Sequence, residues 1–411
     1  MNPDASEVKV AEDHLRRGTP GLRRANLALF VAGLATFAML YCTQPLMPVF
    51  SAEFGVTPAV ASLSLSLATA TLAVALLLAG SFSEAWGRTR MMTASLAFSS
   101  LLMVLAALSP DFAVLLVLRA AQGVTLAGLP AAAMAYLAEE VHPEHAGFAV
   151  GLYIAGNSVG GLVGRVLSGV LAGAFSWRLA LGSLGLACAL ASFAVWRILP
   201  HSTRFRPRPL STRNLLASLG GHLADRGLLR LYAVGALLMG GFVAVYNYIS
   251  YHLLGSPYGL SQAAVGWIFA LYLVGTFSSA WMGRLADALG RGRVLWIGVS
   301  LMLCGAVTTL ASSLALVIAG VAILTFGFFG AHSIASGWVG RRALTARAQA
   351  SALYLLCYYL GSSIGGSAGG IAYSYAGWPG LIGMVAGILV LALIPAAQLI
   401  FLPSLAEKDA G

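Results

Sequence analysis

Two stretches of the sequence share one pattern: residues 80–90 read GSFSEAWGRTR and residues 283–293 read GRLADALGRGR. Each begins with glycine and has an acid four residues later, glycine seven later, and arginines eight and ten later. Glycine permits a tight bend between helices, arginine suits the headgroup level of a membrane, and an acid suits the positive N-terminal end of another helix. The pattern predicts two equivalent loops, formed by Gly80, Glu84, Gly87, Arg88 and Arg90 and by Gly283, Asp287, Gly290, Arg291 and Arg293.

Two further pairs of segments repeat at nearly the same offset. FGVTPAVASL from Phe54 aligns with YGLSQAAVGW from Tyr258, and GNSVGGLVG from Gly156 aligns with GSSIGGSAG from Gly361. Thr57 and Ser261 occupy equivalent positions in the first pair and are predicted to cap helix N-termini. Three matches in the same order predict two homologous halves, an arrangement found in transporters built from parallel repeats.

The composition places the chain in a membrane. Of the 411 residues 59% are apolar and only 9% are charged, whereas a soluble domain has about 25% charged residues. This excludes an ordinary soluble enzyme and a disordered chain, and the scattered basic residues exclude a nucleic-acid binder. No period of alternating polarity predicts a membrane barrel. We therefore expect an all-α fold with twelve spans, at 26–50, 58–80, 91–108, 112–138, 146–172, 178–199, 230–254, 262–283, 294–312, 314–338, 348–374 and 379–403.

The polar break between the sixth and seventh spans divides the chain into two six-helix bundles. The predicted parts are a cytoplasmic tail at 1–25, bundles at 26–199 and 230–403, a cytoplasmic linker at 200–229 and a cytoplasmic tail at 404–411. If the first residue is cytoplasmic, the inner segments hold 21 of the 24 Lys and Arg residues and the outer segments hold only Arg178. The positive-inside rule therefore places both termini in the cytoplasm.

No sequence motif predicts catalysis or a bound metal. Cys42, Cys188, Cys304 and Cys357 each stand alone in an apolar run, and no phosphate-binding loop or hydrolase motif occurs at a membrane edge. We expect neither an enzyme, a cofactor nor a metal site. Because each half can bury its small-residue faces against the other, we expect a monomer.

These motifs resemble those of the major facilitator superfamily. The two glycine–acid–arginine loops look like its hallmark loop, and RAAQG from Arg119 and GNSVGG from Gly156 resemble motifs of the drug/proton antiporter-like branch. Together with YCTQPLMPVF from Tyr41, the chain is similar to bacterial inner-membrane arabinose or drug efflux permeases, although Asn157 replaces the usual proline. The resemblance implies a multi-pass inner-membrane transporter whose loops gate the cytoplasmic side, Glu84 facing the span that starts near Ala348 and Asp287 the one near Ala146.

Glycines recur every fourth residue in the fifth and eleventh spans and so form one smooth face on each helix. Such a face permits either close packing or sliding against a neighbouring helix, and the sequence does not separate the two. Pro45 and Pro48 predict a kink in the first span. The packing set is Gly156, Gly160, Gly161, Gly164, Gly361, Gly365, Gly366 and Gly369.

A few polar and aromatic residues within the spans are candidates for a solute site. Arg119 lies deep in the fourth span, where a charge costs about 2.5–3.5 kcal/mol and requires a partner or a wet cavity. It contacts solute, tunes a proton site or bonds backbone carbonyls. Arg165, near an outer end, is predicted to reach the headgroups or to hold the outer gate, with direct contact to the solute as a third alternative. The solute-binding set is Tyr41, Gln44, Arg119, Gln122, Asn157, Tyr246, Asn247, Tyr354 and Tyr358.

Few residues within the spans are candidates for binding a coupling proton. No Asp or Glu lies well inside a span, and His332 is the only such side chain whose ordinary pKa lies near neutrality. His332, with Arg119, is the candidate for proton coupling, and the other interpretation of His332 is a hydrogen-bonded core residue. Uniport, protonation of Asp111 or Glu53 through water, or a solute that carries its own proton are further alternatives. Arginine without a carboxylate disfavours a permanent cation. We expect export of a neutral or weakly acidic organic solute by proton antiport, with a facilitative carrier or importer, or more remotely a membrane sensor, as alternatives.

Overall fold

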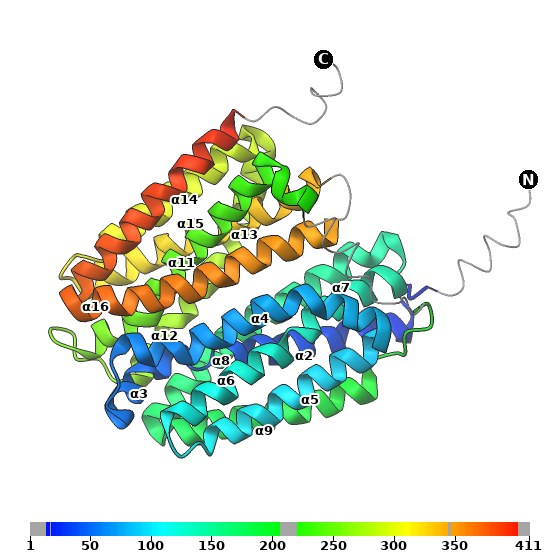
Figure 1. Ribbon diagram of the computed structural model, residues 1–411, viewed down its shortest axis with the longest axis horizontal. Coiled ribbons are helices and arrows are strands. Elements are labelled where there is room, and N and C mark those ends of the chain that lie inside the picture. Colours follow the sequence, from blue (N-terminus) through cyan, green and yellow to red (C-terminus); the bar gives the residue numbers. More distant parts are fainter. Residues whose placement is uncertain (1–13, 17, 206–219, 344–346, 402–411) are drawn as a thin grey trace, which may run out of the picture.

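A computed structural model describes residues 14–16, 18–205, 220–343 and 347–401. The N-terminal half comprises α2 (Pro20–Tyr41), η1 (Gln44–Leu46), α3 (Met47–Phe54), α4 (Pro58–Trp86), α5 (Arg88–Ala107), α6 (Phe112–Leu126), α7 (Gly128–Glu140), α8 (Pro143–Ala174) and α9 (Trp177–Ile198). The C-terminal half comprises α11 (Arg226–Leu254), α12 (Gln262–Ile268), η2 (Phe269–Leu271), α13 (Tyr272–Leu289), α14 (Arg291–Thr308), α15 (Leu314–Arg342) and α16 (Arg347–Ile400). The two halves lie side by side (Figure 1).

The predicted twelve-span, all-α fold is confirmed. Among the described residues, 11 helical segments are long and apolar enough to cross a membrane, and α16 contains two spans joined at Ala376 and Gly377, whose backbone is not helical. Large apolar side chains such as Leu190 and Ile371 remain exposed on the outer surface of the bundle, as lipid contact requires. The predicted C-terminal tail and most of the predicted N-terminal tail lie outside the described residues, as does the middle of the linker.

Several local predictions are also confirmed. The side chains of Thr57 and Ser261 accept hydrogen bonds from the backbone N–H of Val60 and Ala264, so both cap their helices. The first span breaks at Pro45 and continues as α3. A second break, at η2 in the eighth span, contains no proline and has no signal in the sequence.

The long helices run between two ends of the molecule, the inner end and the outer end. The inner end is where α2 begins and α4, α9 and the last helical turn of α16 end. The outer end is where α3 and α11 end and α16 bends at Gly377.

The glycine faces pack helices together within each half. Ideal Cβ atoms on Gly156, Gly160 and Gly164 would lie 2.3, 2.1 and 2.5 Å from carbonyl oxygens of α2. In the C-terminal half, a Cβ on Gly361 would lie 2.1 Å from the Ala236 carbonyl oxygen of α11. These distances require glycine, and they match the close-packing alternative for these faces.

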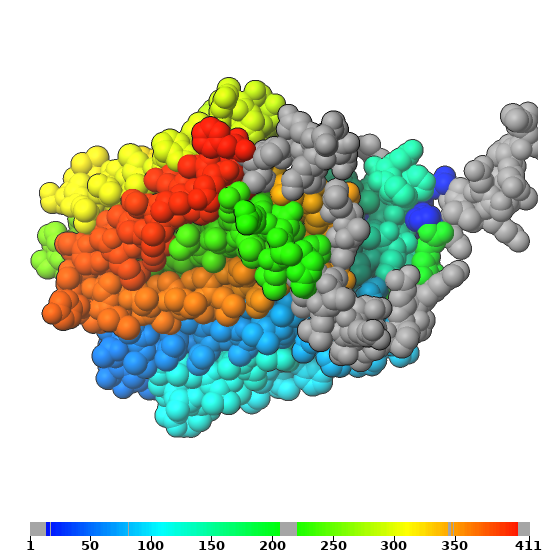
Figure 2. All heavy atoms as spheres, turned by 45° about the horizontal axis from the view of Figure 1, so that its top comes forward, coloured from blue at the N-terminus to red at the C-terminus, as the bar shows by residue number. Residues whose placement is uncertain are grey.

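The two halves meet at the outer end through two similar crossings. In one, Gly169 and Gly173 of α8 lie against Gly266 and Ala263 of α12, and in the other Gly370 of α16 lies against Ala59 of α4. Figure 2 shows α16, in orange, running along α4, in blue. The Ser51 and Tyr251 hydroxyls, 2.7 Å apart, also join the halves there.

No hydrogen bond or ion pair joins the halves at the inner end within the described ranges. The ion pairs found there, Arg88 with Glu139 and Arg342 with Asp225, each lie inside one half. Desolvation alone would raise the pKa of Asp225, but hydrogen bonds from Arg342 and two backbone N–H groups lower it. Among the described residues, the hydrogen bonds between the halves therefore lie toward the outer end and in the middle of the molecule, and none lies at the inner end.

The glycine packing makes a prediction about stability. Gly160→Ala puts a Cβ into the backbone of α2, where neither helix can yield cheaply, and should lower the free energy of unfolding by about 1–3 kcal/mol. Gly151→Ala is the control, because the same helix has nothing within 4 Å of that position. Thermal unfolding of the purified protein in detergent measures both, and equal effects would contradict the close-packing account.

Candidate functional site

The Arg119 guanidinium is fully buried, and its N–H groups donate hydrogen bonds to backbone carbonyls. Its Nε donates to Ser64 O of α4 at 2.8 Å, Nη1 to Met39 O at 2.9 Å and Nη2 to Leu40 O at 2.6 Å. Because α2 ends at Tyr41, its last carbonyls have no N–H partners within the helix. Arg119 supplies those donors, which matches the hydrogen-bonding alternative among its predicted roles. Nη1 also donates to Gln122 Oε1, and Gln122 Nε2 donates to Ser99 O.

Arg165, in contrast, contacts residues of both halves. Its side chain is buried, with Nε donating to Gln44 Oε1 at 2.6 Å and Nη1 donating to Gly161 O at 2.7 Å. The guanidinium carbon lies 4.1 Å from the centre of the Tyr41 ring and 4.3 Å from that of Tyr272. Tyr41 belongs to α2 and Tyr272 to α13, so one cation contacts an aromatic ring from each half.

A hydrogen bond extends this environment into the seventh span. Gln44 Nε2 donates to Asn247 Oδ1 at 2.7 Å, so Arg165, Gln44 and Asn247 form a chain from α8 through η1 to α11. Gln44 and Asn247 are two of the predicted solute-binding residues at equivalent positions of the two halves, and the structure brings them into direct contact. We call Arg165, Gln44, Asn247, Tyr41 and Tyr272 the Arg165 cluster.

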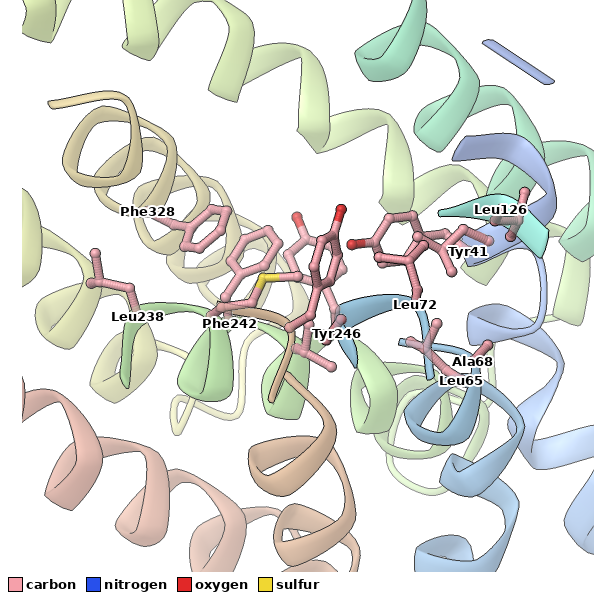
Figure 3. Packing of buried hydrophobic residues seen from close by; sticks show 14 of the residues in the cluster. Tyr41, Leu65, Ala68, Leu72, Leu126, Leu238, Phe242, Tyr246 and Phe328 are labelled. Atoms are coloured by element: carbon pink, nitrogen blue, oxygen red, sulfur yellow. The ribbon is translucent and has the colours of Figure 1, made fainter. Parts of the chain in front are cut away.

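The C-terminal half contributes an aromatic wall. His332 Nδ1 lies 2.8 Å from the Tyr354 hydroxyl, and the His332 ring lies 4.6 Å from that of Tyr358. The Tyr246 and Thr325 hydroxyls are 2.7 Å apart. Figure 3 shows Tyr41 and Tyr246 approaching from opposite halves above the buried apolar packing. Four predicted residues, Tyr246, Tyr354, Tyr358 and His332, thus belong to this wall.

Asn157 lies apart from the Arg165 cluster. Its Oδ1 would be 2.3 Å from a Cβ on Gly33, so it lies where α8 crosses α2. Tyr272, by contrast, was not among the sequence candidates. One aromatic residue in an apolar span gives no signal of its own, and its partner Arg165 is distant in sequence.

The two loops of the opening motif adopt the expected bends. Gly87 and Gly290 have φ of 104° and 88°, a region that favours glycine, and each is the single residue between two helices. Glu84 and Asp287 form no hydrogen bond or ion pair with any residue that the structure describes. The Ala348 side chain, which was predicted to face Glu84, lies outside what is described. The gate contacts therefore stay a prediction for a state with the inner end closed.

The candidate alternatives for proton binding lie at the outer end. Glu53 accepts hydrogen bonds from Trp177 Nε1 at 2.5 Å and from Arg178 Nη1 at 2.7 Å. Asp111 caps α6 by accepting from the backbone N–H of Val114. Both carboxylates are engaged in local structure at this end.

Two pseudo-equivalent six-span bundles around a shared buried cluster define a membrane transporter fold, and comparison identifies the family. A sequence model of the Major Facilitator Superfamily matches residues 29–255 and 232–410. The chain belongs to this superfamily of transporters, and it is not an enzyme.

Relatives and solved structures agree with this assignment. The chain is 49% identical over 380 residues to an uncharacterized MFS-type transporter, YybF, of Bacillus subtilis, covering 92% of this chain and 94% of the relative. It is 46% identical over 396 residues to the inner membrane transport protein YnfM of Escherichia coli, covering 96% and 95%. A bacterial homologue of the human lysosomal transporter Spinster, solved inward-facing and unoccupied, has a similar fold, with TM-score 0.75, 17% identity and 93% and 97% coverage.

The hydrogen bonds of Arg119 make a prediction that separates its alternative roles. Arg119→Gln leaves the buried carbonyls of Met39 and Leu40 without donors, at about 1–3 kcal/mol each. We expect a clearly lower thermal unfolding midpoint, whereas Arg178→Gln, which removes a half-exposed ion pair, should change it little. An Arg119→Gln protein of unchanged stability that binds solute less tightly would favour the solute-contact role instead.

Proposed function

We propose that this protein is a secondary active transporter that exports a small organic solute by alternating access, coupled to proton antiport. The observation that carries the proposal is the asymmetry between the two ends. The halves touch through small residues and a few hydroxyls at the outer end, and a buried polar cluster lies between them. Such contacts are weak enough to part, so that rocking of the halves can expose the cluster to one side at a time.

We propose that the inner end is cytoplasmic, with both chain termini on that side of a bacterial inner membrane. Glu84 and Asp287 then close the inner end in the opposite state, each against the N-terminal end of a helix in the other half. A monomer suffices for this cycle, since all the residues of the cluster belong to one chain.

The chemistry of the cluster supports a neutral or weakly acidic solute. The side chains around Arg165 are amides, phenols and a cation, and no carboxylate contacts them among the described residues. A permanent cation would lose its hydration there with nothing to offset that cost.

His332 is the proposed site of proton coupling. It lies among Tyr354, Tyr358 and Phe328, and its bond to the Tyr354 hydroxyl depends on which ring nitrogen carries the proton. Protonation changes His332 from donor-and-acceptor to double donor, and this change can bias the packing of α15 against α16.

A second candidate function is a facilitative carrier of the same fold. The absence of a carboxylate from the Arg165 cluster favours it.

Proton coupling can be tested in proteoliposomes with labelled L-arabinose, gluconate and chloramphenicol as probes. We expect accumulation of at least one probe when a pH gradient is imposed, and its loss when nigericin dissipates the gradient. His332→Gln should abolish gradient-driven accumulation while leaving exchange at equal pH, because only the proton step is removed.

The exposed His201, at the inner end, provides the control His201→Gln, which should behave as wild type. Accumulation that survives nigericin, or an unchanged His332→Gln protein, would contradict proton coupling through this residue. Exchange without accumulation in the wild type would support the facilitative carrier.

A further inference from the structure

Arg165 carries a buried charge without a counter-charge. The residue is 2% exposed, and no acidic side chain among the described residues bonds to it. The rings of Tyr41 and Tyr272 attract the cation, but a cation–π contact contributes only about 2 kcal/mol even when desolvated. A buried arginine of this kind is stable when a partner with negative charge completes it.

The cluster also holds hydrogen-bond donors that have no acceptor. Arg165 donates through Nε and Nη1, while Nη2 has no partner in the described part of the chain. The Tyr272 hydroxyl and Asn247 Nδ2 are buried and unpaired. Buried polar groups are almost always bonded, so two buried unpaired groups, in the same cluster as a guanidinium nitrogen that also lacks a partner among the described residues, indicate a missing acceptor.

The position of the cluster suits a ligand that responds to rocking of the halves. Arg165 contacts Tyr41 of the N-terminal half and Tyr272 and Phe269 of the C-terminal half. Tyr272 in turn packs edge-on against Phe242 and Phe329, in the aromatic wall of the C-terminal half. A molecule held by Arg165 therefore has one charged anchor between the halves and an apolar surface beside it.

We propose that Arg165 binds the carboxylate of the transported solute, which is an organic acid with an apolar or aromatic body. One carboxylate oxygen accepts from Nη2 and the other from the Tyr272 hydroxyl, and the body of the solute lies against the aromatic wall. This inference rests on the proposed transport function and narrows its solute class to anions.

The proposal is tested by thermal unfolding of the full-length protein in detergent with matched acid and amide probes. Benzoate and nicotinate differ from benzamide and nicotinamide only in the charged group. At least one of the two acids should raise the unfolding midpoint saturably, and its amide should not. Arg165→Gln should raise the Kd of that acid at least tenfold, and Arg165→Lys should raise it less, because the charge remains but the fork geometry is lost.

Gln44→Glu provides a variant that keeps Arg165. It substitutes an isosteric carboxylate at the atom 2.6 Å from Nε, so the arginine gains a fixed counter-charge. We expect an unfolding midpoint at least equal to that of the wild type and no response to the acids. Arg178→Gln, which removes a half-exposed outer-end arginine, should keep the wild-type response.

Three outcomes would overturn the proposal. The first is an unfolding midpoint that responds equally to acids and amides, or to neither. The second is an unchanged Kd of the acid in Arg165→Gln. The third is an equal, saturable rise of the midpoint with chloride or sulfate, which would indicate an inorganic anion only. Counterflow of L-arabinose and chloramphenicol separates this failure from failure of the proposed function. If a neutral probe is exchanged equally by the wild type and Arg165→Gln, transport stands and the carboxylate site is wrong; if no solute of either class is moved, the proposed function is wrong.

Discussion

The structure depends on one constraint, which is that water is absent from the core of a bilayer. Every polar group within a span must find its partner inside the protein. This explains why Arg119 lies where α2 is interrupted. The end of α2 before Pro45 leaves carbonyls without donors, and the Arg119 guanidinium bonds two of them, Met39 O and Leu40 O, together with Ser64 O of α4. The same constraint makes Arg165 unusual, because no acidic side chain bonds to it in the part of the chain that the structure describes, and its charge lies against the Tyr41 and Tyr272 rings.

Close contacts between helices occur both within each half and between the halves. Within each half, glycine faces bring α8 close against α2 and α16 close against α11. Between the halves, crossings of small residues join α8 to α12 and α4 to α16, together with hydrogen bonds of Gln44, Ser51, Thr69, Gln262 and Ser363. Motion between the halves requires these contacts to break or rearrange.

Much of this architecture could be predicted from the sequence because it depends on local composition and repetition. Hydropathy gave the spans, the paired glycine–acid–arginine loops gave the duplication, and Thr57 and Ser261 gave helix starts. The sequence placed Gln44 and Asn247 at equivalent positions of the two halves but did not predict that they contact each other. The contact between Arg165 and Tyr272 could not be predicted. An aromatic ring within a span is usually a packing residue, and the way in which two distant spans cross decides which ring contacts which cation. The break at η2 was missed for a similar reason, since no proline or glycine marks it.

The central claim, that the halves open the cluster to one side at a time, is tested most directly by cross-linking the outer end. An ideal Cβ at Gly173 lies 3.5 Å from that of Ala263, within the range of about 3.5–4.5 Å that a disulfide needs. In a chain without its native cysteines, Gly173→Cys with Ala263→Cys should oxidise readily, and a third cysteine at Tyr358 should then react with an impermeant thiol reagent from the inner side alone. The pair Gly147→Cys and Gly283→Cys, at inner-end positions with nothing within 4 Å, is the matched control and should not oxidise in this state. Labelling of the Tyr358 position from both sides while the outer end is cross-linked would contradict the account.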